Sequence, residues 1–196
     1  MASPPRDKQG FRVNPGDEEK FKFDGYTHAV TTITSDHRQV HDGMVFHITN
    51  RVASLANAGE HDILVDVPAF TYPHIRAAIF SLSDSPCDIE AYEGTTTSAD
   101  GSALTALNRN RNSTKTSSTT FYTGPTITGA GTQIHDRYVP DAGGQGSNQI
   151  GVITPTFGEE WILKPSTKYL LRLTNNSGGA ITLSYEIIWY ELSYEQ

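Results

Sequence analysis

Large apolar residues recur at every second position near the C-terminal end of the chain, from residue 180 to residue 191. Successive side chains of a β-strand point to opposite sides, so this period of two is typical of a strand with one buried face. The pattern therefore predicts a long, half-buried strand here. The apolar series consists of Ile181, Leu183, Tyr185, Ile187 and Trp189.

The preceding segment, residues 168–175, alternates in the same way through Tyr169, Leu171 and Leu173. Between the two segments, residues 175–179 are Asn, Asn, Ser, Gly and Gly, and Asn and Gly tolerate the positive φ angles of hairpin loops. We therefore expect the two strands to pair with each other as a long antiparallel hairpin.

The rest of the chain predicts short strands and no long helix. Turn residues recur every 8–12 positions, which favours a sandwich, jelly roll or barrel over alternating strands and helices. Residues 75–82 fit a strand or a helical turn, and residues 52–58 a strand or a connecting loop. The other predicted strands are 26–33, 40–50, 63–67, 87–96, 133–139, 150–154 and 160–163.

A polar insertion occupies residues 95–132, where twelve of thirty-eight residues are Thr. Few apolar side chains are present, so we expect the insertion to run over a surface. Within it, residues 121–122 and 126–128 predict short strands, and residues 141–148 beyond it predict a flexible loop.

The length of 196 residues fits one domain with a tail. We expect an extended or flexible N-terminal arm over residues 1–24 and an antiparallel β-sandwich domain over residues 25–196. The arm is either a disordered tail or a segment that orders against a neighbouring subunit, with Phe11, Phe21 and Phe23 as anchors.

Charge and composition exclude several classes of protein. The net charge of -7 argues against nonspecific nucleic-acid binding, which needs clustered Lys and Arg. The single cysteine, Cys87, rules out an internal disulfide framework and a cysteine-based zinc site. The N-terminal stretch is polar, so we expect no signal peptide and no membrane partner for a protein made in a cytoplasm.

The sequence contains no pattern typical of a catalytic or metal site. Of the seven histidines, His37 and His41 would lie about 13 Å apart if their segment were a strand, which is too far for one metal. Asp88 and Glu90 alternate with Ile89 and fit the wet face of a strand. A nucleophile elbow and a phosphate-binding loop are both absent. We therefore expect a protein that is not an enzyme and has no catalytic residue, metal site or cofactor.

Residues 108–112 differ from the rest of this acidic chain because two arginines and three amides stand together. The guanidinium group of arginine binds carboxylates through two parallel hydrogen bonds. One interpretation is a docking loop or an intersubunit clamp. The other is a solvated turn held by internal hydrogen bonds.

Several segments, in their order and spacing, resemble the small β-sandwich decoration, or cement, proteins of tailed bacteriophages. They cover roughly residues 40–191. The matching stretches are LANAG at 55–59, HDILVDVP at 61–68, EAYEG at 90–94, LNRNR at 107–111, TITGAGT at 126–132, ILKP at 162–165, YLLRLTN at 169–175 and WYE at 189–191.

The resemblance implies a jelly-roll-like sandwich that forms a homotrimer on the outside of an icosahedral head, bridges major capsid protein subunits and has no catalytic residues. The protein would then be located in the virion, at the head exterior. Two alternatives are a receptor- or carbohydrate-binding module of a tail or baseplate, and a cupin-like metalloprotein. The residues we expect at subunit or capsid contacts are Phe11, Arg12, Phe21, Phe23, Asn108, Arg109, Asn110 and Arg111.

Overall fold

The structure is a computed structural model that describes residues 22–23, 30–31, 35–84, 86–140, 149–153 and 160–193. The chain divides into two units, Met1–Arg38 and Gln39–Gln196. In the first unit, β1 (Lys22–Phe23) pairs antiparallel with β2 (Val30–Thr31). The short helix α1 (Ser35–His41) spans the boundary between the units.

After the end of α1, the elements that the structure describes in the second unit are all strands. In chain order they are β3 (Val45–Leu55), β4 (Glu60–Val67), β5 (Thr71–Leu82), β6 (Cys87–Glu93), β7 (Thr96–Ala99), β8 (Ser102–Ala103), β9 (Leu107–Asn108), β10 (Thr120–Thr123), β11 (Thr126–Gly129), β12 (Thr132–Val139), β13 (Gln149–Ile153), β14 (Trp161–Ile162), β15 (Thr167–Asn175) and β16 (Ile181–Ser193).

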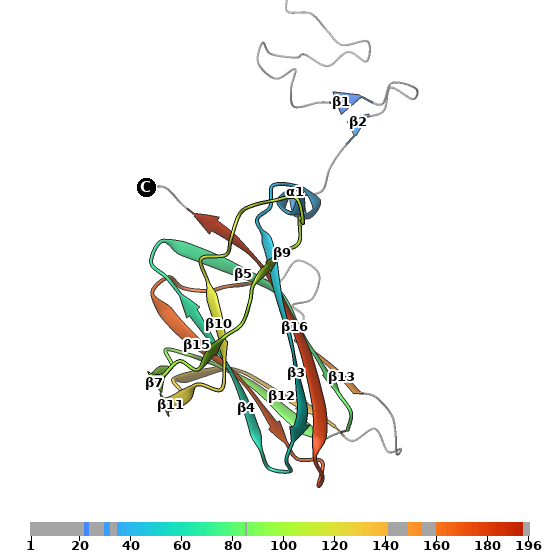
Figure 1. Cartoon of the computed structure of the whole chain (residues 1–196), viewed down its shortest axis with the longest axis vertical. Coiled ribbons are helices and arrows are strands. Elements are labelled where there is room, and N and C mark those ends of the chain that lie inside the picture. Colours follow the sequence, from blue (N-terminus) through green and yellow to red (C-terminus); the bar gives the residue numbers. More distant parts are fainter. Residues whose placement is uncertain are drawn as a thin grey trace, which may run out of the picture. The chain divides into compact units, whose positions relative to one another are not determined.

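These strands form two six-stranded antiparallel sheets that pack against each other (Figure 1). Sheet I has the order β12-β6-β15-β4-β10-β8. Sheet II has the order β13-β5-β16-β3-β9, and β14 pairs with β5 beside β13. A separate pair, β7 with β11, belongs to the polar insertion. The predicted all-β sandwich is therefore confirmed.

The strands of the sandwich are paired with one another as in a jelly roll. Strands from the first half of the unit pair with strands from the second half: β3 with β16, β4 with β15, β5 with β13, and β6 with β12. The two halves of this unit thus run antiparallel to each other along their length. The chain passes from one sheet to the other at almost every connection. These eight strands, four in each sheet, are paired in the jelly-roll arrangement.

The predicted C-terminal hairpin is wrong, because β15 and β16 lie in different sheets. β15 pairs with β4 and β6, whereas β16 pairs with β3 and β5. A period of two shows that one face of a strand is buried, but it does not show which strand lies alongside. Residues 175–179 form an arch between the sheets, and Gly178 has the expected positive φ of 85°.

Asn175 holds this arch in place. Its side chain is fully buried, and its Nδ2 group donates to the carbonyl oxygens of Leu55, Ala56 and Gly179 at 2.9, 3.0 and 2.7 Å. Its Oδ1 atom accepts from the backbone N–H of Ser177 at 3.0 Å. One side chain therefore satisfies the backbone of the β3–β4 turn and of the arch together.

The core lies between the two sheets and is centred on Trp189, which is fully buried. Its ring centroid lies 4.5 Å from that of Phe121 in sheet I and 6.0 Å from that of Phe46 in sheet II. Phe121 belongs to the polar insertion, which we expected to run over a surface. The insertion instead extends both sheets through β8, β9 and β10 and contributes to the core.

Other local predictions have mixed outcomes. The strand predicted from residue 40 begins at Val45, because residues 35–41 are helical. Residues 75–82 are strand, and β3 continues to Leu55 before the chain turns. The predicted strands at 63–67 and 133–139 are confirmed, and the one at 87–96 is confirmed as far as Glu93, where β6 ends. Most of the predicted strand at 26–33 and the predicted flexible loop at 141–148 lie outside the described residues.

We predict that Asn175→Asp lowers the free energy of unfolding by about 2–4 kcal/mol, because the buried carboxylate cannot donate to the three carbonyl groups. Urea unfolding followed by tryptophan fluorescence measures the change. Asn112→Asp is the matched control, since Asn112 is exposed. If Asn175→Asp loses no more stability than the control variant, the role of Asn175 in holding the arch is contradicted.

Candidate functional site

The turn that follows β9 contains the two predicted arginines, and buried polar contacts fix its backbone. Asn108 has a relative exposure of 8%, and its Nδ2 group donates to the carbonyl oxygens of Gly43 and Lys115 at 2.9 and 3.1 Å. Its Oδ1 atom accepts from the N–H of Asn110 at 2.9 Å. Asn108 therefore acts inside the protein, and its buried amide is not available to a partner.

Asn110 continues this internal network. Its Nδ2 group donates to the carbonyl oxygen of His41 at 2.9 Å, and its Oδ1 atom accepts from the N–H of Asn112 at 3.1 Å. The internal hydrogen bonds of the second interpretation are thus present. They fix the backbone from which the two arginine side chains project.

Both arginine side chains lie at the surface. Arg109 forms an exposed ion pair with Glu186, in which Nη2 and Oε1 are 2.9 Å apart. Arg111 is also exposed, and its Nη1 group lies 3.5 Å from the carbonyl oxygen of Asn108. Exposed ion pairs contribute little to stability, so Arg109 can exchange Glu186 for another carboxylate at small cost. We call Asn108 to Arg111 the arginine turn.

Among the predicted contact residues of the arm, Phe23 alone belongs to the part of the chain that the structure describes. Phe11, Arg12 and Phe21 lie outside the described residues. Phe23 lies in β1, where it pairs with Val30. Their role in subunit contacts stays a prediction.

A second surface feature at the same end of the sandwich is the connection between β4 and β5. Phe70 lies in this connection with a relative exposure of 71%. Its φ is 63°, a left-handed conformation that is unfavourable for a residue with a bulky side chain. The chain thus keeps a large aromatic ring in water at a strained position, which the sequence pattern did not indicate.

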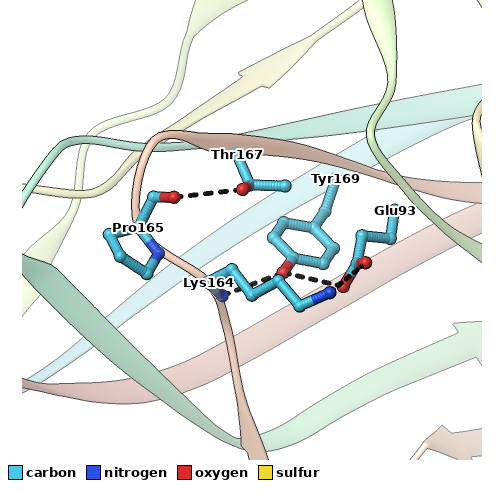
Figure 2. Close-up of polar contacts among 5 residues, drawn as sticks. All are labelled: Glu93, Lys164, Pro165, Thr167 and Tyr169. Carbon is cyan, nitrogen blue, oxygen red and sulfur yellow. Dashed lines mark hydrogen bonds and ion pairs between the residues drawn. The ribbon is translucent and has the colours of Figure 1, made fainter.

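The loop between β14 and β15 runs alongside this connection and is held by Tyr169 (Figure 2). Ser166 donates its N–H to the carbonyl oxygen of Pro68 at 3.3 Å, and Leu163 donates to that of Pro73 at 2.9 Å. The hydroxyl oxygen of Tyr169 accepts from the N–H of Lys164 at 2.9 Å. A tyrosine near the start of a strand that binds the backbone just upstream is the arrangement of a tyrosine corner.

Tyr169 also connects the core to a surface ion pair. Its hydroxyl group donates to Oε2 of Glu93 at 3.1 Å, and Oε1 of Glu93 lies 2.6 Å from Nζ of Lys164. Burial raises the pKa of Tyr169 to about 12, so the hydroxyl group stays protonated and can donate. The ammonium group of Lys164, followed by the hydroxyl of Tyr169, lowers the pKa of Glu93.

A pocket of about 210 Å³ lies between the loop that follows the arginine turn and the start of β5. Apolar side chains of Phe46, Met44 and Leu192 line it, together with Lys115, Thr71 and Glu191. We call it the end pocket.

Glu191, at the end pocket, is buried and fully hydrogen-bonded. Its carboxylate accepts from the hydroxyl of Ser117 at 2.6 Å and from the N–H groups of Ser118 and Thr119 at 2.8 and 3.0 Å. It also accepts from Nε1 of Trp189 at 3.1 Å. This carboxylate therefore attaches the loop of the insertion to β16.

The histidines are not arranged as a metal site in the part of the chain that the structure describes. His37 and His41 lie on α1, so the separation of about 13 Å considered for a strand does not apply to them. Within the described residues, no three His, Cys, Asp or Glu side chains come close enough together to hold a metal ion. His74 instead contacts Tyr190 and Glu160, with its Nδ1 atom 2.9 Å from the Tyr190 hydroxyl and 3.0 Å from Oε1 of Glu160.

Comparison of the chain with models of protein families, with curated proteins and with solved structures gives no match. Among the described residues, no helix has the length and apolar character needed to cross a membrane.

We predict that Lys164→Ala raises the pKa of Glu93 toward its ordinary value, as measured by NMR titration of the Glu93 side-chain carbonyl. Because folding lowers this pKa, the stabilisation is present above about pH 4.3 and is lost as the pH falls through the folded value. The stability difference between the native protein and Lys164→Ala should therefore shrink below about pH 4. Lys164→Arg retains the charge and serves as the control, and an unchanged Glu93 titration in Lys164→Ala would contradict the ion pair.

Proposed function

We propose that this protein is a structural component of a virion, a decoration or cement protein that binds the outside of a phage head. In this proposal it acts as a homotrimer that bridges subunits of the major capsid protein and stabilises the lattice against internal pressure. It is made in the host cytoplasm and carries out no catalysis. Binding involves neither nucleic acid nor membrane.

The observation that carries the proposal is the arginine turn. On a chain with a net charge of -7, Arg109 and Arg111 project from a backbone that Asn108 and Asn110 hold in one conformation. A loop that is already ordered loses little conformational entropy when it binds. Two exposed guanidinium groups on such a loop suit a partner surface that presents carboxylates.

The fold is compatible with this role. Jelly rolls occur in viral capsid proteins as well as in lectins and cupins, so the architecture alone does not select among these functions. The resemblance of residues 40–191 to decoration proteins favours a role on a viral capsid. An oligomer that meets a repeating lattice through several weak contacts binds it tightly, which suits small contact loops such as this one.

We predict that Arg109→Ala together with Arg111→Ala weakens binding to empty, expanded phage heads that lack this protein by about ten- to a hundredfold, because each guanidinium group loses a charge-assisted hydrogen bond. Co-sedimentation over a range of protein concentrations measures the change.

The matched control is Arg51→Ala with Arg137→Ala, which removes the same charge from exposed positions outside the turn. If the arginine-turn variant binds heads as tightly as the native protein, the turn takes no part in head binding. No binding of the native protein to heads would contradict the decoration role. A receptor- or carbohydrate-binding role at the tail or baseplate, tested by a glycan screen, would then replace it.

A further inference from the structure

The end pocket has the size and lining of a site for an aromatic side chain. Its volume of about 210 Å³ exceeds that of an apolar cavity of about 150 Å³ that binds benzene. Met44 and Leu192, both half-buried, supply apolar surface on which a ring can pack, and Phe46, which also lines the pocket, is itself almost fully buried. A phenyl group therefore fits the space, with room for the bonds that join it to a backbone.

Charged groups at the pocket favour a neutral ring over an ionic ligand. The carboxylate of Glu191 is already satisfied by four donors from Ser117, Ser118, Thr119 and Trp189. Nζ of Lys115 lies 3.0 Å from the carbonyl oxygen of Asp42 and 3.3 Å from Sδ of Met44, so it is held beside the apolar lining. An ammonium group close to an aromatic face adds a cation–π attraction.

Phe70 is the matching aromatic group on the same molecule. It directly precedes Thr71, which lines the end pocket, yet its ring does not line the pocket and remains 71% exposed. Its left-handed backbone, with φ of 63°, belongs to the same rigid end of the sandwich as the loop that Tyr169 holds. An exposed aromatic ring on an ordered loop is typical of an interface anchor.

We propose that Phe70 of one copy enters the end pocket of a neighbouring copy. Phe70 adjoins the end pocket in the chain, so the contact can close reciprocally between two copies or head to tail in a ring, in which each copy gives one aromatic side chain and accepts another. A ring of three copies fills every pocket. The inference rests on the proposed function for the number three, while the contact itself rests on the pocket and on Phe70.

Two variants separate the two sides of the contact. Phe70→Ala removes the ring and leaves the pocket intact, whereas Thr116→Trp fills the pocket from its exposed rim and leaves Phe70 intact. We expect the native protein to sediment as a trimer and each variant alone to sediment as a monomer. Loss of an interface anchor should raise the dissociation constant of self-association at least about thirtyfold. An equimolar mixture of the two should form one-to-one pairs, because one intact ring can enter one intact pocket.

Sedimentation velocity of the full chain over a range of concentrations measures these masses. Ile162→Ala is the control, since Ile162 is 58% exposed and apolar but does not line the pocket. A native protein that stays monomeric, a Phe70→Ala variant that stays trimeric, or a mixture that does not pair would each overturn the inference. Head binding is measured separately, so ring formation without head binding upholds this contact and contradicts the decoration role. If the native protein is a monomer and still binds heads, the decoration role is upheld and this contact is contradicted.

Discussion

The indole N–H of Trp189 requires a hydrogen-bond acceptor inside the core, and the group that supplies it organises one end of the sandwich. Glu191 accepts from Nε1 of Trp189 and also from the backbone of Ser118 and Thr119. A buried carboxylate is costly unless it is fully hydrogen-bonded, so the loop of the insertion must close over Glu191. Phe121, just beyond that loop, then packs on Trp189.

The surface features follow from this arrangement. Once the loop around Ser118 is attached to β16, the preceding segment is held against Gly43 by the buried amide of Asn108, and the two arginines project from it. On the other side of the end pocket, Tyr169 fills the core and holds the neighbouring loop through Lys164. This end of the sandwich therefore presents exposed guanidinium groups, an exposed aromatic ring and a pocket together.

Sequence pattern was sufficient for the class of fold but not for the pairing of strands. The alternation around Trp189 correctly predicted a half-buried strand, whereas its pairing with the strand of Tyr169 was wrong, because both strands bury their faces in one core from opposite sheets. The arginine turn was visible as an unusual cluster of residues. Phe70 was not, because its significance lies in its exposure and positive φ, which depend on the tertiary structure.

Imaging phage heads with and without the protein tests most directly the proposed binding of this jelly roll to the outside of the head. A difference map from electron cryo-microscopy should show extra density on the outer surface that fits the sandwich. We expect the end with the arginine turn to face the capsid lattice. Heads whose outer surface is identical with and without the protein would contradict the account.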